Sequence, residues 1–370
     1  WYRYHHLFAE LLQQRLITKH PKLNHALHAK ASRWYESHGI YPEAIHHALT
    51  GEDIRTAIRL IEKGALDALE RSDIRFILKW VERLPDTDLK EHPCLFIYHT
   101  WALLLTGQAG AAKPRLMNTD WLLASVSNAG EAKEKELLGN IAGMKALLAI
   151  WERNIQDVIE YANQALEYLP RNNWIRGYCA ILIGGVYSGN GDLERAREAF
   201  AESAAVGKVA GHKLLEVSGA CNLAYTYEIE GRLQRSLTDF QDAFPLARQD
   251  GEVIPVAGYI YIDIARLYYE LNQLDVAKQH LLTGIRLCQQ LADGRAQTIG
   301  HSLLARVYLA LGENAPSANS IRDADQAHPS PGTSFDLRGG EFALVWLWLN
   351  ENRLDNLAEW LENSPTSISE

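Results

Sequence analysis

The sequence predicts an all-α protein: a superhelical solenoid of antiparallel helix hairpins with a period near 40 residues. Two observations support this fold class. A pattern of small and aromatic residues around a turn returns along the chain, and its turn residues from Gly107 to Asn352 follow one another in steps of 38 to 46 residues. The segments between the turns carry amphipathic helical patterns, and each step is long enough for one helical hairpin.

The repeat is defined by a turn residue and four positions around it. Around Gly191 these are Gly184 seven residues before, Tyr187 four before, Ala196 five after and Ser203 twelve after. Small residues at such positions let two helices cross closely, and the aromatic side chain fills the gap beside them. The turn residues of all copies are Gly39, Gly107, Arg153, Gly191, Gly231, Asn272, Gly312 and Asn352. Gly and Asn adopt the left-handed conformation that ends a helix, so these positions predict turns.

The columns of the repeat resemble the tetratricopeptide pattern. A large apolar residue follows nine positions after the turn, as in Phe200 and Phe240, and Pro170 and Pro329 follow two of the copies. The period exceeds the 34 residues usual for that repeat, which implies longer helices or loops. In such proteins each hairpin buries its apolar face only against its neighbours.

The weaker stretches suggest how the chain is organised. A hairpin over 52–84 does not fit the columns, and loss of periodicity predicts loops within 118–135 and over the Pro- and Gly-rich 327–340. The expected organisation is a helical segment over 1–90 leading from an upstream module, tetratricopeptide-like repeats over 91–363, and a flexible tail over 364–370.

Composition narrows the classes of function. A net charge of −9 and a pI near 5.9 argue against a surface that binds nucleic acid directly. Four widely spaced cysteines without a secretory leader fit a reducing cytoplasm, and no apolar run is long enough to cross a membrane. The first residue is Trp1, within an amphipathic pattern, which is typical of a piece of a longer protein.

The front of the chain carries a second resemblance. WYRYHHLFAELLQQRL, followed by AKASRWYESHGIYPEAIHHALTGED, resembles the segment of MalT-like, LuxR-type ATP-dependent transcription activators where the nucleotide-binding machinery gives way to a helical-repeat sensor. The resemblance implies a STAND-class ATPase module upstream, a helix-turn-helix downstream, and a sensor that binds an inducer and takes part in self-association. This sequence has no G-x-x-x-x-G-K-[ST] loop, so no cofactor is expected here. ATP and DNA are expected only through the flanking modules.

Residues with catalytic or metal-binding potential do not form a convincing site. His25 and His28 lie three apart on one expected helix, but no Cys or repeated His spacing joins them, so no metal is predicted. Glu228 and Glu230 are two apart and face different ways on a helix. The cysteines are interpreted as packing residues. The chain is therefore predicted not to be an enzyme.

The sharper candidate is the concave side of the solenoid, which the first helix of each hairpin is expected to line. Aromatic rings there offer flat apolar area for a ligand, and charged side chains fix its polar groups. The predicted ligand-binding residues are Tyr178, Tyr225, Glu228, Tyr259, Arg266, Tyr269, Glu270, Arg306, Phe342 and Trp346. Arg266 and Arg306 share one column of adjacent repeats and could hold a carboxylate or phosphate.

The occupant of this groove is left open by the sequence. A small-molecule inducer or a modulator protein fits the regulator. The alternative is a cytosolic scaffold that binds a partner peptide. In a third interpretation, rings such as Tyr225 and Trp346 only pack between adjacent first helices.

Overall fold

A computed structural model describes residues 6–70, 74–84, 92–117, 119–126, 130–249, 251–291 and 294–327, with 348, 349, 352–355, 357 and 358. The chain divides into two compact units, Trp1–Asn128 and Ala129–Glu370. In these described ranges the regular structure is almost entirely helical, apart from one short antiparallel hairpin of β1 (Arg248–Gln249) and β2 (Glu252–Val253). The all-α prediction is confirmed.

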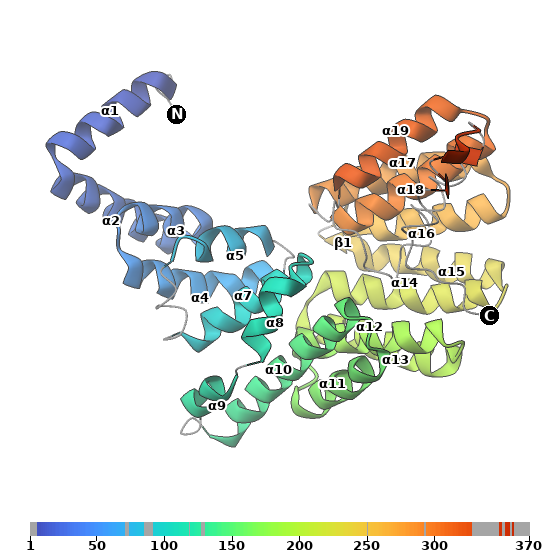
Figure 1. Cartoon of the computed structure of the whole chain (residues 1–370), viewed down its shortest axis with the longest axis horizontal. Coiled ribbons are helices and arrows are strands. Elements are labelled where there is room, and N and C mark those ends of the chain that lie inside the picture. Colours follow the sequence, from blue (N-terminus) through green and yellow to red (C-terminus); the bar gives the residue numbers. More distant parts are fainter. Residues whose placement is uncertain are drawn as a thin grey trace. The chain divides into compact units, whose positions relative to one another are not determined.

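The first unit begins with helices that pack on their sequence neighbours, such as α2 on α3 and α3 on α4 (Figure 1). Its helices are α1 (His6–Lys19), α2 (Pro21–Ser37), α3 (Tyr41–Thr50), α4 (Ile54–Glu70), α5 (Ile74–Val81), α7 (Pro93–Leu105), α8 (Ala109–Leu116) and α9 (Asp120–Val126). The loop predicted within 118–135 is partly wrong, because α9 forms there and its Leu122 is fully buried. The loop predicted over 327–340 and the tail over 364–370 lie outside the described residues but for Ala327, and the boundary near residue 90 stays a prediction.

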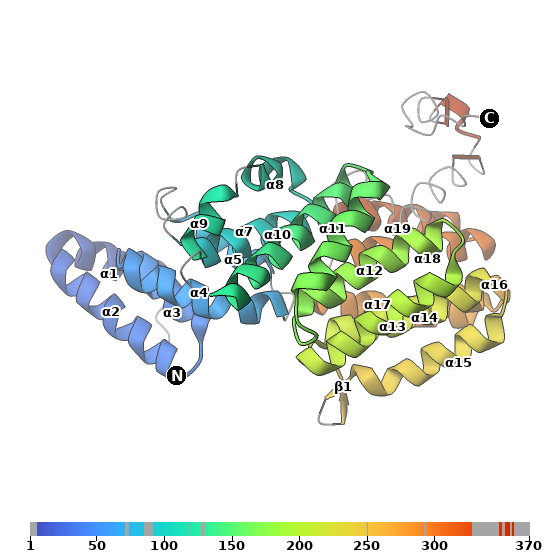
Figure 2. The same ribbon diagram turned by 90° about the horizontal axis from the view of Figure 1, so that it is seen from below.

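The second unit is a stack of helical hairpins. They are α10 (Glu131–Trp151) with α11 (Ile155–Tyr168), α12 (Trp174–Gly189) with α13 (Leu193–Ala210), α14 (Lys213–Ile229) with α15 (Leu233–Ala243), α16 (Ala257–Glu270) with α17 (Leu274–Gln290), and α18 (Gly294–Ala310) with α19 (Asn314–Ala327). A 3-10 turn, η1 (Phe244–Ala247), follows α15. Each first helix packs on its own second helix and on the first helix of the next hairpin (Figures 1 and 2).

The turn residues behave as the sequence predicts. All eight have positive φ, from 54° at Asn352 to 82° at Gly107. In the copy at Gly191, the Gly191 amide donates to the Ser188 carbonyl and the Asp192 amide donates to the Tyr187 carbonyl. These two bonds define the Schellman motif that closes a helix C-terminus. The same pair of bonds recurs at every predicted turn residue.

Two turns of this kind were missed, at Glu52 and at Gly211. Glu52, between α3 and α4, has φ 57° and the same two hydrogen bonds, and Ala57 five residues later is fully buried. The hairpin over 52–84 therefore begins at a repeat-type turn. The repeat pattern looks for Gly or Asn at the turn. It did not reveal the turn at Glu52, because Glu52 adopts the left-handed conformation despite its Cβ.

Small residues allow the close helix crossings that the repeat pattern implies. A Cβ added to Gly184 on α12 would lie 2.5 Å from the ring of Phe200 on α13. At the position five residues after the turn, a Ser hydroxyl donates to a carbonyl of the partner helix across the crossing, whereas the buried Ser203 hydroxyl has no hydrogen-bond partner among the described residues. Ser236 donates to the Ala224 carbonyl at 2.9 Å, and Ser317 to the Ala305 carbonyl at 3.0 Å.

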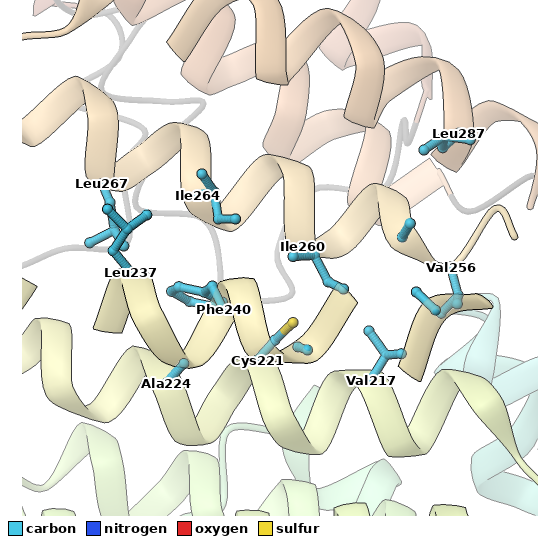
Figure 3. Close-up of a cluster of buried hydrophobic side chains, with 13 residues drawn as sticks. Val217, Cys221, Ala224, Leu237, Phe240, Val256, Ile260, Ile264, Leu267 and Leu287 are labelled. Carbon is cyan, nitrogen blue, oxygen red and sulfur yellow. The ribbon is translucent and has the colours of Figure 1, made fainter. Parts of the chain in front are cut away.

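The core continues from one hairpin to the next. Phe240 of α15 lies in one cluster of buried apolar side chains with Cys221 and Ala224 of α14 and Ile260 of α16 (Figure 3). Each hairpin therefore buries its apolar face against its neighbours, as in a solenoid.

Candidate functional site

The predicted site residues of the second unit lie on successive first helices. Tyr178 is on α12, Tyr225 and Glu228 are on α14, Arg306 is on α18, and α16 carries Tyr259, Arg266, Tyr269 and Glu270. We call the surface that α14, α16 and α18 build from Tyr225, Glu228, Arg266, Tyr269, Glu270 and Arg306 the first-helix face. Phe342 and Trp346 lie outside the described residues.

Arg266 is firmly held on this face. Its Nε donates to Glu228 Oε1 at 2.9 Å, its Nη2 donates to Glu228 Oε2 at 3.1 Å, and Nη2 lies 3.2 Å from Asp263 Oδ1. The guanidinium also lies over the Tyr225 ring, 4.4 Å from its centroid. Burial opposes the charge, but the carboxylates of Asp263 and Glu228 outweigh it, so the pKa of Arg266 is raised above its ordinary value.

Arg306 repeats the stacking but not the ion pair. Its guanidinium lies 4.6 Å from the centroid of the Tyr269 ring on α16. Its Nη2 lies 3.9 Å from Glu270 Oε1, which is beyond hydrogen-bonding distance. Two arginines in one column of the repeat therefore have different partners.

Asp263 is a site residue that the sequence columns missed. It stands nine residues before the turn residue Asn272, a position outside the assumed set. Its spacing of three from Arg266 on one helix was the available signal. Burial and the neighbouring Asp263 carboxylate raise the pKa of the Cys221 thiol, and this cysteine packs in the core between α14 and α16.

Three of the predicted tyrosines, two of them on the first-helix face, are partly buried. Tyr225 packs against the core between α14 and α16, Tyr269 packs against the core between α16 and α18, and Tyr259 contacts both. Part of each ring therefore stabilises the contact between first helices. The structure brings Tyr225, Glu228 and Arg266 together, and separately Tyr269, Glu270 and Arg306.

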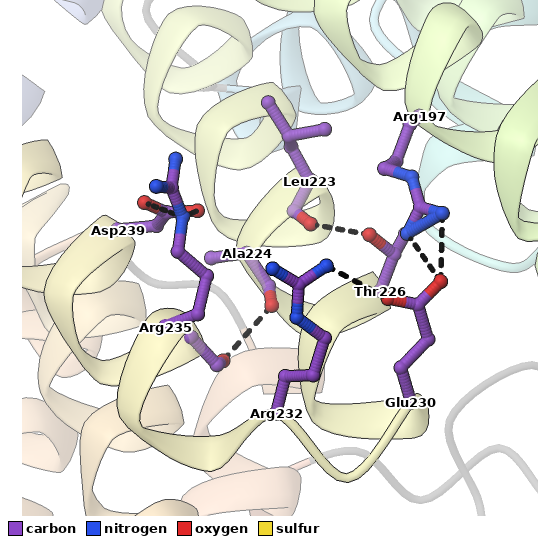
Figure 4. A network of polar contacts seen from close by, with 9 residues as sticks. Arg197, Leu223, Ala224, Thr226, Glu230, Arg232, Arg235 and Asp239 are labelled. Atoms are coloured by element: carbon purple, nitrogen blue, oxygen red, sulfur yellow. Dashed lines mark hydrogen bonds and ion pairs between the residues drawn. The ribbon is translucent and has the colours of Figure 1, made fainter.

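A second polar network lies where one repeat meets the turn of the next. Arg197 of α13 donates two hydrogen bonds to Glu230 Oε1, at 2.8 and 2.7 Å, and Arg232 contacts the other oxygen of Glu230 (Figure 4). Arg197 also lies over the Tyr227 ring, 5.1 Å from its centroid. Two repeats further along the chain the arrangement is similar: Lys278 contacts Glu313 and lies over the Tyr308 ring. We call these the turn-edge ion pairs.

The histidines of the front segment do not converge on a metal site. His25 Nδ1 lies 2.8 Å from the Gly51 carbonyl oxygen, whereas His28 Nδ1 lies 2.8 Å from His47 Nδ1. Within the described part of the chain, no three His, Cys, Asp or Glu side chains gather in a way that would hold a metal ion. The prediction of no metal stays a prediction for the whole chain.

Two hollows are lined by residues other than those of the first-helix face. One, of about 300 Å³, is lined in the first unit by residues that include Arg33, His47 and Asp53. The other, of about 250 Å³, lies over α14 and α15 beside Tyr227 and Asp239. Neither contains a predicted ligand-binding residue. None of the helices in the described ranges is long and apolar enough to cross a membrane.

Hairpins closed by Schellman turns, with small residues at their crossings, define a tetratricopeptide-type helical-repeat protein. The family model of the MalT-like TPR region matches residues 139–370, more than half of the chain. The chain belongs to this family.

Curated relatives share its sequence at a distance. The HTH-type transcriptional regulator MalT of Vibrio cholerae is 21% identical over 375 residues, which cover 98% of this chain and 40% of that protein. MalT of Klebsiella pneumoniae is 23% identical over 75% of this chain and 30% of that protein. The serine/threonine-protein kinase PknK of Mycobacterium tuberculosis is 25% identical over 45% of this chain, but only 15% of the kinase is matched. The chain thus spans less than half the length of these relatives.

A solved structure shares the fold. The STAND protein PH0952 of Pyrococcus horikoshii, which has a tetratricopeptide repeat sensor, matches with a TM-score of 0.55 at 12% identity. The match covers 92% of this chain and 53% of that one. At this identity it supports the fold alone.

Proposed function

We propose that this chain is the effector-binding and interaction region of a LuxR-type transcriptional regulator. The observation that carries the proposal is the first-helix face, where aromatic rings and charged groups from three successive first helices stand side by side. Family membership supports it, because the relatives that match most of this chain are named as transcriptional regulators. The effector is a small-molecule inducer or a modulator protein.

In the proposed mechanism, the effector contacts several first helices at once. Such a ligand favours the arrangement of repeats to which it binds more tightly, and its effect is limited by that difference in affinity. ATP would act only in an upstream module and DNA only through a downstream helix-turn-helix. The chain itself would be cytoplasmic and without catalysis, and the shift would promote self-association of the full-length regulator.

A metabolite screen tests the proposal. The purified 370-residue chain is heated with a panel of sugars, amino acids, nucleotides and organic acids, and stabilising compounds are titrated by calorimetry. We expect a hit whose binding is lost in Tyr269→Ala and kept in Leu282→Ala, a control on α17 with 43% of its residue surface exposed. Binding that survives Tyr269→Ala, or a panel without any hit, would overturn small-molecule sensing at this face. Binding of a partner peptide instead would favour the scaffold.

A further inference from the structure

The two arginines of the first-helix face differ in how far their donors are used. Both stand six residues before a turn residue, and both stack on a tyrosine of the preceding first helix. Sequence position alone therefore makes Arg266 and Arg306 equivalent. Their carboxylate partners distinguish them.

Arg266 has few N–H donors available for a ligand. Both oxygens of Glu228 accept from it, and Asp263 adds a second carboxylate. Two negative charges against one positive charge would repel an incoming anion. This arginine joins α14 to α16.

Arg306 has N–H donors available for a ligand. Its contact with Glu270 is a single one at 3.9 Å, and 48% of the Glu270 side chain is exposed. The Arg306 side chain is itself 30% exposed, so solvent reaches it, and the Tyr269 ring holds the guanidinium in place. A guanidinium presents five N–H donors in a planar fork that matches a carboxylate or phosphate.

A second donor stands on the same helix. Ser302 precedes Arg306 by one helical turn, and its buried hydroxyl has no hydrogen-bond partner in the structure. Buried hydroxyls in folded proteins are normally paired. We propose that Arg306, supported by Tyr269 and with Ser302 beside it, binds the carboxylate or phosphate group of the effector, whereas Arg266 is an inter-repeat clamp. This inference rests on the proposed function and names the chemical class of its ligand.

Side-chain NMR of the chain tests the assignment with simple probes. The ¹⁵N signals of the arginine Nε groups are followed while inorganic phosphate, pyruvate or uncharged methyl pyruvate is added at constant ionic strength. Variants Arg306→Gln and Arg266→Gln identify the two signals. Arg232→Gln, at an arginine with 59% of its side chain exposed, is the matched control for general anion binding.

We expect pyruvate or phosphate to shift the Arg306 signal in a saturable way, and methyl pyruvate to leave it unchanged. A response to only one anion identifies the group as carboxylate or phosphate. Arg306→Gln should weaken binding by about tenfold or more, whereas Arg266→Gln and Arg232→Gln should retain it. An unchanged affinity in Arg306→Gln, a response at Arg266, or equal binding of the ester would overturn the inference. A neutral effector found in the metabolite screen would then leave the proposed function intact.

Discussion

Arg266 on α16 and Glu228 on α14 form a bidentate pair, with Nε and Nη2 donating to the two carboxylate oxygens at 2.9 and 3.1 Å. The two residues are 38 positions apart in the sequence and belong to successive repeats. The pair therefore joins one first helix to the next, and such contacts between neighbouring repeats contribute to the stability of a solenoid.

Removing one partner of this pair should destabilise the second unit. Glu228 has only 12% of its side chain exposed, so Arg266→Leu leaves a carboxylate that is poorly solvated. Because Arg266 is itself a quarter exposed, we expect a loss of about 2 kcal/mol, less than for a fully buried pair. The double variant Arg266→Leu, Glu228→Leu should regain part of the loss. Urea unfolding of the four proteins of this cycle measures both effects, and strictly additive losses would show that the pair is not coupled.

A glycine at a helix crossing should tolerate no side chain. A Cβ on Gly207 of α13 would lie 2.3 Å from the Glu216 backbone nitrogen of α14, and backbone cannot move aside as a flexible side chain can. Gly207→Ala should cost about 1–3 kcal/mol of unfolding free energy. Gly189→Ala on α12 is the control, because nothing lies within 4 Å of its added Cβ, and it should be neutral or stabilising. Equal effects of the two substitutions in thermal unfolding would refute the close crossing.

Replacing the turn residue Arg153 by Gly should stabilise the protein. Arg153 has φ 58°, a conformation that costs an L-residue with a Cβ about 1 kcal/mol or more. Relief of this strain outweighs the greater conformational entropy that Gly has in the unfolded chain. Arg153→Gly should therefore raise the free energy of unfolding by about 0.5–1 kcal/mol. Gly191→Ala, at φ 81°, should do the opposite. The midpoints of chemical unfolding report the sign, and a destabilised Arg153→Gly would contradict the turn assignment.

The second unit should lose stability in mild acid through His212. This residue caps α14, accepting from the Leu215 amide, and burial lowers its pKa to about 4. The unfolded state, with a pKa near 6.5, binds the proton more readily, so stability falls as pH drops from about 6.5 towards 4, by about 3 kcal/mol in total. His212→Ser keeps a capping oxygen and should flatten this part of the pH profile. An equally steep loss of stability in His212→Ser and in the parent chain would contradict this role of His212.

The sequence revealed the repeat because local chemistry dictates it. A left-handed turn favours Gly or Asn, and a close crossing requires a small residue, so Gly191 and Gly184 can be recognised without coordinates. The turn at Glu52 was not predicted, because Glu rarely adopts the left-handed conformation that it has there.

The candidate site was only partly predictable. The columns placed Arg266 and Arg306 on one face, but which carboxylates they meet depends on distances between helices that no spacing encodes. The turn-edge ion pairs were missed for the same reason, because Arg197 and Glu230 are 33 residues apart in the sequence. The predictions for Phe342 and Trp346 fall outside the described residues and remain predictions.

The central claim is that the first helices of the hairpins bind the effector. Hydrogen–deuterium exchange with a compound from the metabolite screen tests it most directly, because it compares first and second helices in one experiment without mutation. We expect slower exchange in peptides of α14, α16 and α18, with little change in α15, α17 and α19. Protection confined to the second helices, or to the first unit, would contradict it.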